Sequence, residues 1–452
     1  MTPRLDSIRE CFEGVIPGHI ATCDPDGVPN LAYLSQVQYI DNEHVALSYQ
    51  FFNRTRQNVL ANSPVRLLLT SHLTGAQYRL TLRYLHTEQS GALFEQMKAK
   101  LAGIAAHTGM SNVFQLLGSD IYRVLAIEQV PGPALPPPAP LISHLPALRT
   151  ALQRLARCNQ LESLLDTALD SLQQSFGIQH AMLLMPDESR QRLYTLASLG
   201  YPDSGVGSEV PLGSGLIGIC ARERTPIRIG FMSSEYSYGR AIRERLAAEG
   251  NGDALETAIP MPGLPHAASQ MAVPILAMDR LLGVLYVESV DDLHFGYEDE
   301  DALVAFASQL GLGMLALQES PDAGPDEVPP AGAPAPHTER AEPIATTPLH
   351  VQHYSANDSV FINDDYLIKG VAGAILWALL SDHVERGRTS FTNKALRADP
   401  RIPLPGLSDN LEARLVLLQK RLAERHTGIT LTKTGRGCFE LSVQGTLVLA
   451  SA

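Results

Sequence analysis

Three consecutive residues in the first third of the chain, Arg54, Thr55 and Arg56, have side chains suited to holding a phosphate. Each guanidinium presents a planar fork of donors, and the threonine hydroxyl adds a short donor beside them. No second set of substrate-binding residues accompanies this group in the sequence. The pattern therefore favours a bound cofactor over turnover, and we assign no catalytic residue.

A second chemical signal is basic charge near the carboxyl-terminal end. Residues 386–436 contain eleven basic and four acidic residues, a net charge of +7, in a chain whose net charge is −13. Such an asymmetry is expected when one domain alone meets an anionic partner such as DNA.

The centre of this basic segment has the spacing of an amphipathic helix. One apolar stripe should face a core, and it consists of Leu411, Leu415, Leu418 and Leu422. Asn410, Arg414 and Arg421 lie on the adjoining flank, where we expect them to reach base edges or phosphates. Lys433 and Arg436 follow in a hairpin that would reach the neighbouring backbone.

Proline-rich stretches divide the chain at two places. Residues 131–140 read PGPALPPPAP, and proline there removes backbone donors and fixes φ, which excludes the interior of a helix or sheet. We expect linkers at residues 131–144 and 319–350. Three folding units remain, at residues 1–130, 145–318 and 351–452.

The first unit has the pattern of an antiparallel barrel. The turn sequence Asp24-Pro25-Asp26-Gly27 separates two runs that alternate like strands, and residues 94–106 have helical spacing. Further strand-like runs precede and follow that helix, so the fold class expected here is an antiparallel β split barrel with one or two short helices.

This unit resembles the pyridoxamine 5'-phosphate oxidase-like split barrels through residues 18–22, residues 24–29 and the stretch NRTRQNVLANSP at 53–64. The resemblance implies FMN bound at the interface of a homodimer. In that family the basic and hydroxyl residues of the last stretch hold the flavin phosphate. Carried over to this sequence, the cofactor-binding positions are Arg54, Thr55, Arg56 and Asn58.

The second unit begins and ends with helical spacing and has strand-like runs between, which predicts an α+β sandwich. It resembles GAF domains through residues 196–201, 210–221, 225–229 and 271–275. GAF domains bind cyclic nucleotides, bilins, haem or small metabolites, or bind nothing and serve dimerisation. The resemblance leaves both a small-molecule effector and an empty pocket open.

The third unit reads as a short sheet, three helices and a hairpin. It resembles the winged-helix output domains of OmpR-like response regulators through the helix at 411–422 and the hairpin Gly435-Arg436-Gly437-Cys438-Phe439. Carried over residue by residue, the resemblance implies DNA contacts from Arg414, Lys420, Arg421 and Arg436. Winged helices also dock proteins, and Leu417 stands where many members carry arginine.

Composition and cysteine spacing indicate the cellular compartment of the protein. No run of about twenty apolar residues is present, so no membrane span is expected. The five cysteines are scattered and show no C-x-x-C spacing, which argues for a reducing compartment and against a metal site. We expect a cytoplasmic protein.

Together these features predict a sensory transcriptional regulator. A flavin or small ligand at the barrel or GAF unit would control DNA binding by the carboxyl-terminal unit. Two alternatives stay open: a flavin-dependent oxidoreductase with a regulatory GAF domain, and a signalling adaptor that docks proteins.

Overall fold

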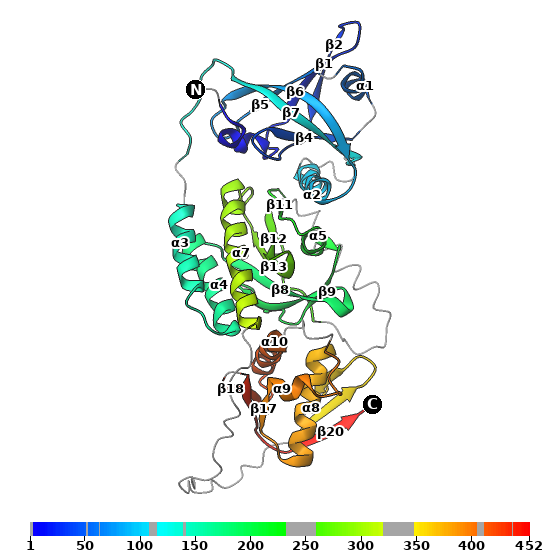
Figure 1. Ribbon diagram of the computed structural model, residues 1–452, viewed down its shortest axis with the longest axis vertical. Coiled ribbons are helices and arrows are strands. Elements are labelled where there is room, and N and C mark those ends of the chain that lie inside the picture. Colours follow the sequence, from blue (N-terminus) through cyan, green and yellow to red (C-terminus); the bar gives the residue numbers. More distant parts are fainter. Residues whose placement is uncertain are drawn as a thin grey trace.

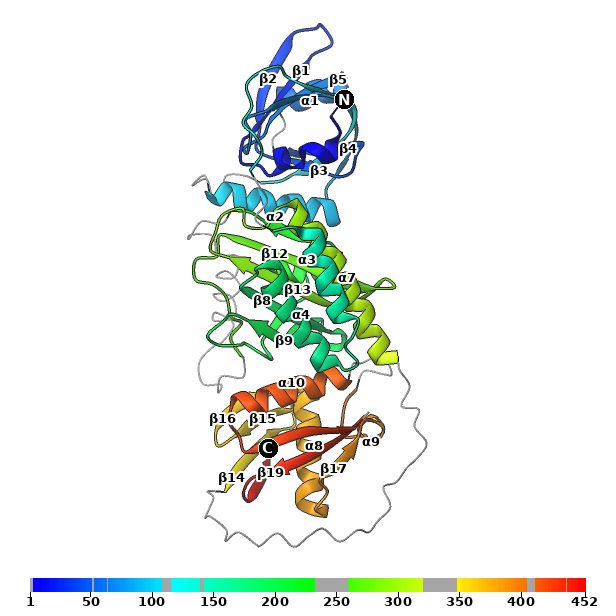
Figure 2. The ribbon, with the colours of Figure 1, turned by 90° about the vertical axis from the view of Figure 1, so that its left-hand side faces the viewer.

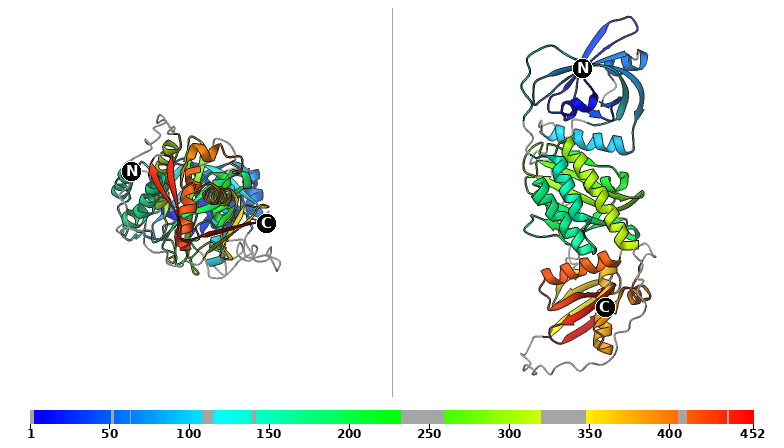
Figure 3. Two further views of the ribbon diagram at one scale, coloured as in Figure 1. Left: turned by 90° about the horizontal axis from the view of Figure 1, so that it is seen from below. Right: turned by 60° about the vertical axis from the view of Figure 1, so that its left-hand side comes forward.

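The computed structural model describes residues 3–50, 53–62, 64–107, 115–138, 142–231, 259–319, 348–404, 411–435 and 437–452. Three folded regions follow one another along the long axis of the molecule, with the amino-terminal barrel at one end and the carboxyl-terminal domain at the other (Figure 1). The right-hand view of Figure 3 shows the same stacking from another side.

The amino-terminal region is a seven-stranded antiparallel sheet in the order β2-β1-β5-β6-β7-β4-β3. Its strands are β1 (Gly18–Cys23), β2 (Pro29–Leu34), β3 (Val37–Tyr39), β4 (His44–Tyr49), β5 (Pro64–Thr70), β6 (Gln77–Glu88) and β7 (Gly118–Gln129). The predicted turn joins β1 to β2, since the Gly27 amide donates to the Asp24 carbonyl at 3.0 Å. Three helices accompany the sheet: η1 (Leu5–Phe12), α1 (Arg54–Ala61) and α2 (Ala92–His107).

The middle region is a six-stranded antiparallel sheet in the order β10-β9-β8-β13-β12-β11. Its strands are β8 (His180–Asp187), β9 (Arg192–Leu199), β10 (Glu209–Pro211), β11 (Ile227–Ile229), β12 (Ser269–Ala277) and β13 (Arg280–Ser289). Helices α3 (His144–Leu155), α4 (Leu161–Phe176) and α7 (Tyr297–Glu319) cover one face, and α5 (Gly215–Glu223) covers the other (Figure 1). The short helix η2 (Glu188–Arg190) follows β8.

Helix α7 is long and apolar enough, by length and composition alone, to cross a membrane. In this structure its apolar side chains are part of a domain core. Phe306, Leu310 and Met314 are fully buried, and they belong to one cluster with Leu164 and Leu172 of α4. Packing against the sheet and the neighbouring helices therefore accounts for its hydropathy.

The carboxyl-terminal region contains two small sheets, β16-β15-β14-β20 and β17-β19-β18. Its strands are β14 (Leu349–Tyr354), β15 (Ser359–Ile362), β16 (Asp365–Ile368), β17 (Ser390–Thr392), β18 (Ile429–Gly435), β19 (Cys438–Val443) and β20 (Leu447–Ser451). Its helices are α8 (Gly370–Arg386), α9 (Asn393–Arg397) and α10 (Leu411–Glu424). The leucine stripe predicted for α10 is confirmed, because all four leucines are at most 8% exposed.

Three strands of this region, β14, β17 and β20, are not predicted from the sequence. Strand β14 begins at Leu349, inside the stretch expected to be linker, and β20 pairs with it in parallel. The partners lie about a hundred residues apart, so no local turn signal relates them. Figure 2 shows α2 lying across one end of the middle region and α10 across the other.

Candidate functional site

A cavity of about 520 Å³ opens between the β1–β2 hairpin, β4, β7 and α1 of the barrel. Its walls are largely apolar and aromatic, and they include Ile20, Tyr33, Leu47, Val59 and Tyr122. A cavity of this size with apolar walls and a few polar groups is typical of a small-molecule or cofactor site.

The polar end of the cavity is built around Arg56. Its guanidinium makes an ion pair with the Asp120 carboxylate and donates to Thr87 Oγ1 at 2.8 Å. The Tyr49 ring lies 4.5 Å from the same guanidinium, a cation–π distance. Burial raises the pKa of Asp120, against the opposing effects of the hydrogen bond from Thr87 and the charge of Arg56. The pair adds no net charge to the cavity.

Helix α1 separates the four cofactor-binding residues predicted from sequence into two faces. Thr55 and Arg56 line the cavity, as does Val59 one turn later. Arg54 points elsewhere, with its side chain 56% exposed and 3.3 Å from Asp24. Asn58 is buried and donates to Thr22 Oγ1 at 3.2 Å. Residues four apart share a helix face, so Arg54 and Asn58 lie together and away from the cavity.

Sequence reasoning missed the groups that surround Arg56. Asp120, Thr87 and Tyr49 come from β7, β6 and β4, which lie adjacent in the sheet but far apart in the chain. No spacing motif could reveal them, because antiparallel pairing alone brings these strands together.

One wall residue, Phe231, belongs to the middle region and lies two residues after the end of β11. Helix α2 packs against β11, and a Cβ on Gly103 of α2 would lie 2.7 Å from the Phe231 carbonyl oxygen. The absence of a side chain at Gly103 therefore permits this close approach. A ligand in the barrel cavity would touch the second domain directly.

The lining of the cavity fits a flavin phosphate in part. The apolar and tyrosine walls suit a planar aromatic ring, and the first turn of α1 enters the cavity at Asn53 and Thr55. The first amides of a helix have no intrahelical acceptor and favour an anion. Thr55 and the start of α1 thus fit a phosphate, whereas Arg56 is already neutralised by Asp120.

The residues predicted to contact DNA are placed differently from the expectation. Arg414 and Arg421 are each only 4% exposed. Arg414 pairs with Asp187 of the middle region at 3.1 Å, and Arg421 donates to the Leu367 carbonyl at 3.1 and 3.2 Å. The prediction that these two arginines are free to meet DNA was wrong in this conformation, because Arg414 packs against the middle region and Arg421 is bonded to β16 of its own domain.

Lys420 and Lys433 are also engaged. Lys420 lies 3.1 Å from Asp166 of α4, and Lys433 makes an ion pair with Glu412 of α10. Asn410 and Arg436 lie outside the residues that the structure describes. DNA binding by any of the six remains a prediction.

Within the described ranges, no group of three or more His, Cys, Asp or Glu side chains is placed to hold a metal ion. The described cysteines are all unpaired thiols, and burial raises the pKa of Cys220 well above its ordinary value.

Two family models match the chain. The pyridoxamine 5'-phosphate oxidase model matches residues 5–125, and the GAF domain model matches residues 160–314. The chain joins a pyridoxamine 5'-phosphate oxidase-like domain to a GAF domain. The family resemblances stated for these two units are thereby confirmed, while neither matched range reaches the carboxyl-terminal domain, whose winged-helix character stays a prediction.

Solved structures resemble single parts of the chain. The GAF domain of Acinetobacter phosphoenolpyruvate-protein phosphotransferase is 21% identical, covers 40% of this chain and 97% of its own, with a TM-score of 0.31. Free methionine-R-sulfoxide reductase from Neisseria meningitidis is 17% identical over 40% of this chain and 99% of its own, with a TM-score of 0.31. An FMN-binding protein from Syntrophomonas wolfei is 16% identical over 28% and 86%, with a TM-score of 0.24. No curated protein matches the chain.

Proposed function

We propose that this chain is a cytoplasmic regulatory protein in which a flavin phosphate, FMN, binds the barrel cavity and the GAF domain relays its state to a DNA-binding carboxyl-terminal domain. The observation that carries the proposal is the cavity itself, with an apolar and aromatic chamber, a helix start at its polar end and Phe231 of the GAF domain in its wall. A GAF effector at a separate pocket is compatible with the same output.

Three groups of this chain would hold the cofactor. Thr55 and the first amides of α1 would bind the phosphate, and Arg56 would border it. Tyr33, Tyr49 and Tyr122 offer ring faces and edges for stacking. A bound flavin supplies a redox-active ring, and the chain's own part is to orient that ring against Phe231.

A homodimer is part of the proposal. Tyr33 lines the cavity and is 77% exposed, and Leu31 on the same face of edge strand β2 is 71% exposed. Large apolar side chains on an exposed edge strand typically mark an interaction surface. A second copy lying there would cover the open side of the cavity. Light scattering after gel filtration measures the molar mass of the protein in solution and so distinguishes a dimer from a monomer.

The cofactor prediction is tested by titrating the full chain with FMN and following quenching of flavin fluorescence. Replacing Arg56 with Met removes a cavity donor and leaves Asp120 as an unpaired carboxylate facing the phosphate, so we expect affinity to fall at least about tenfold. Arg54→Met is the matched control, because Arg54 lies outside the cavity and its loss should change affinity less than about twofold.

Equal losses from both arginine variants would contradict the placement of the phosphate. A colourless protein that binds no FMN would contradict the cofactor. Since Arg56→Met also leaves Asp120 buried, the unfolding midpoint of each variant is measured in parallel, and Arg56→Met is compared with the neutral pair Arg56→Met/Asp120→Leu.

The DNA-binding part of the proposal is supported by the concentration of basic residues in the carboxyl-terminal domain and by its element order. Exposed Lys394 of α9 and the half-buried Lys433 of β18 offer phosphate contacts. Fluorescence anisotropy of a labelled duplex should show affinity that falls steeply with salt. A duplex that does not bind at low salt would favour the protein-docking alternative.

A further inference from the structure

A second face of helix α10 is buried although it does not face the core of its own domain. Arg414, Leu417 and Arg421 are spaced three and four residues apart, so they form one stripe. All three are at most 4% exposed. The stripe was expected to meet DNA, and its burial needs another partner.

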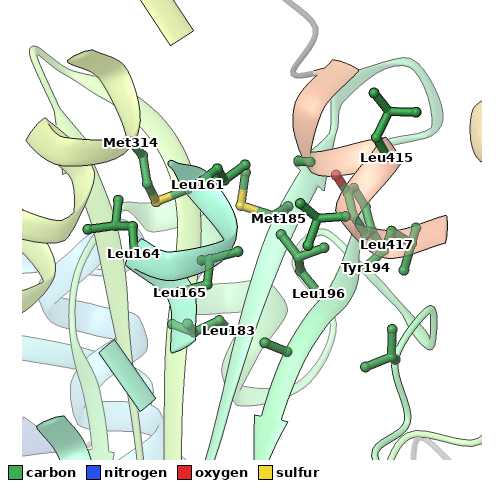
Figure 4. Packing of buried hydrophobic residues seen from close by; sticks show 14 of the residues in the cluster. Leu161, Leu164, Leu165, Leu183, Met185, Tyr194, Leu196, Met314, Leu415 and Leu417 are labelled. Atoms are coloured by element: carbon green, nitrogen blue, oxygen red, sulfur yellow. The ribbon is translucent and has the colours of Figure 1, made fainter. Parts of the chain in front are cut away.

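The GAF domain covers Arg414 and Leu417, whereas the Arg421 guanidinium donates to the Leu367 carbonyl of its own domain. The Arg414 guanidinium pairs with Asp187 and lies 4.4 Å from the centroid of the Tyr194 ring. Leu415 and Leu417 of α10 lie beside Tyr194, Met185 and Leu161 of the GAF domain in one contiguous apolar cluster (Figure 4).

A glycine of the GAF domain lies beside Leu417 and Arg421. Gly207 has φ +88°, and a Cβ built there would lie 3.8 Å from both Leu417 Cδ1 and Arg421 Cδ. The same Cβ would lie 2.7 Å from Ile259 Cδ1, which real side chains do not tolerate. Glycine at 207 is thus required by its φ and by Ile259, and its backbone lies within van der Waals reach of α10.

Ion pairs also join the two domains, and in each pair described here the carboxyl-terminal domain supplies the cation and the GAF domain supplies the carboxylate. Lys420 lies 3.1 Å from Asp166, and Lys369 lies 3.2 Å from Glu209. With the Arg414–Asp187 pair, three carboxylates of the GAF domain meet three cations of the carboxyl-terminal domain. Burial acts to raise the pKa of Asp187, but the charge of Arg414 and hydrogen bonds from Ser189 and Arg414 outweigh it and lower that pKa.

We propose that this GAF surface, defined by Asp166, Asp187, Tyr194, Gly207 and Glu209, is an intramolecular competitor of DNA for helix α10. The inference rests on the proposed DNA-binding function. The carboxylates occupy the cations that duplex phosphates would otherwise neutralise, and Tyr194 covers the intervening leucine. While α10 packs against the GAF domain, it cannot reach DNA. Separation of the two domains exposes the basic residues of α10.

The chain that connects the GAF domain to the carboxyl-terminal domain is long enough for the two to separate. The connection from α7 to β14 is the segment 320–348. A chain of 29 residues can span at most roughly 100 Å when extended. Charge pairs at the rim are partly solvated, since the Asp166 side chain is 58% exposed, so exchange of a carboxylate for a phosphate requires little desolvation.

The first experiment detects the closed contact without DNA. A carbodiimide joins an amine to a carboxylate in direct contact, so treatment of the full chain should yield a peptide cross-linked between Lys420 and Asp166, found by mass spectrometry. Asp166→Asn removes the product and serves as the assignment control. If the wild-type protein gives no such cross-link, the contact does not form in solution and the proposal fails.

The second experiment measures competition. Asp166→Lys places two cations together at the edge of the contact. Asp170→Lys makes the same charge change one turn along α4, where Asp170 pairs with Arg154 of α3 at 3.2 Å. With a fluorescein-labelled mixed-sequence duplex of about 30 base pairs, we expect Asp166→Lys to bind roughly fivefold tighter than Asp170→Lys. Excess duplex should also lower the cross-link yield in the wild-type protein.

The outcomes separate the two proposals. Equal duplex affinity for both lysine variants, with a cross-link that persists at saturating duplex, overturns the competition and leaves DNA binding intact. Absence of duplex binding by every variant, including Asp187→Asn combined with Asp166→Lys, overturns the proposed DNA-binding function itself.

Discussion

The two junctions of the GAF domain use charge in opposite ways. At the barrel side, Arg228 of β11 donates to Glu13 at 2.7 Å and to Glu300 of α7 at 2.9 Å. Lys100 of α2 donates to the Phe12 carbonyl at 2.6 Å and lies 3.7 Å from Glu13. Glu13, Lys100 and Arg228 are all at most 8% exposed.

Each of these buried ionisable groups depends on the others. Burial alone would raise the pKa of Glu13, but the charges of Arg228 and Lys100 outweigh it and lower that pKa. Burial lowers the pKa of Lys100 to about 8. Desolvated charges of this kind are tolerated only when every partner is in place, so this junction should open only on unfolding.

At the carboxyl-terminal side, apolar contacts form the centre and most ion pairs lie at a solvated edge. Asp166 is 58% exposed, and Lys420 and Lys369 are 23% and 24% exposed. Such pairs are worth little individually and are exchangeable with solvent or another anion. The barrel junction buries a network of charges, Glu13, Lys100 and Arg228. The carboxyl-terminal junction buries one pair, Arg414–Asp187, and its other two pairs are partly exposed, so it should be the easier junction to separate.

The largest effect should come from removing the central cation of the buried junction. Arg228→Met leaves Glu13 and Glu300 without their shared partner, and we expect a loss of about 3–5 kcal/mol in the free energy of unfolding. Chemical denaturation of the full chain measures it. Arg123→Met, which breaks the exposed Arg123–Glu43 pair, is the control and should cost less than about 1 kcal/mol. Similar losses would show that the two environments do not differ.

A smaller effect is expected from the apolar centre of the other junction. Leu417→Ala removes a contact with the Gly207 surface, and we expect a loss of about 2–3 kcal/mol together with a fall in the Lys420–Asp166 cross-link. Leu379→Ala in α8 truncates a fully buried leucine of the domain core. That control should destabilise the domain while the cross-link persists; loss of the cross-link in both would contradict a specific role for Leu417.

The smallest effect is salt dependence. Raising the salt concentration from about 0.05 M to 0.5 M shortens the Debye length and weakens solvated pairs by up to about 1 kcal/mol, but buried pairs much less. We expect the cross-link yield at Lys420 to fall, whereas hydrogen exchange in β11 and α2 stays unchanged. Equal sensitivity of both junctions would remove the distinction between them.

Much of the architecture was predictable because local signals carry it. The Asp24–Gly27 turn, the leucine stripe of α10 and the helices that open and close the GAF domain follow from turn chemistry and periodicity. The turn between β12 and β13 consists of Met278 and Asp279, both with positive φ, and it contains no glycine. Turns without glycine give a weaker signal for their exact position.

The candidate site was predictable only in part. The sequence by itself determined which side chains are available, namely the Arg-Thr-Arg group at the start of α1 and the basic stripe on α10, and their helical spacing. Tertiary structure decided what each of them faces. Asp120 reaches Arg56 through strand pairing, and Asp187 reaches Arg414 through the packing of two domains. Helical periodicity specifies a buried face, but not whether a core, a second domain or DNA buries it, because that depends on contacts between residues distant in the chain.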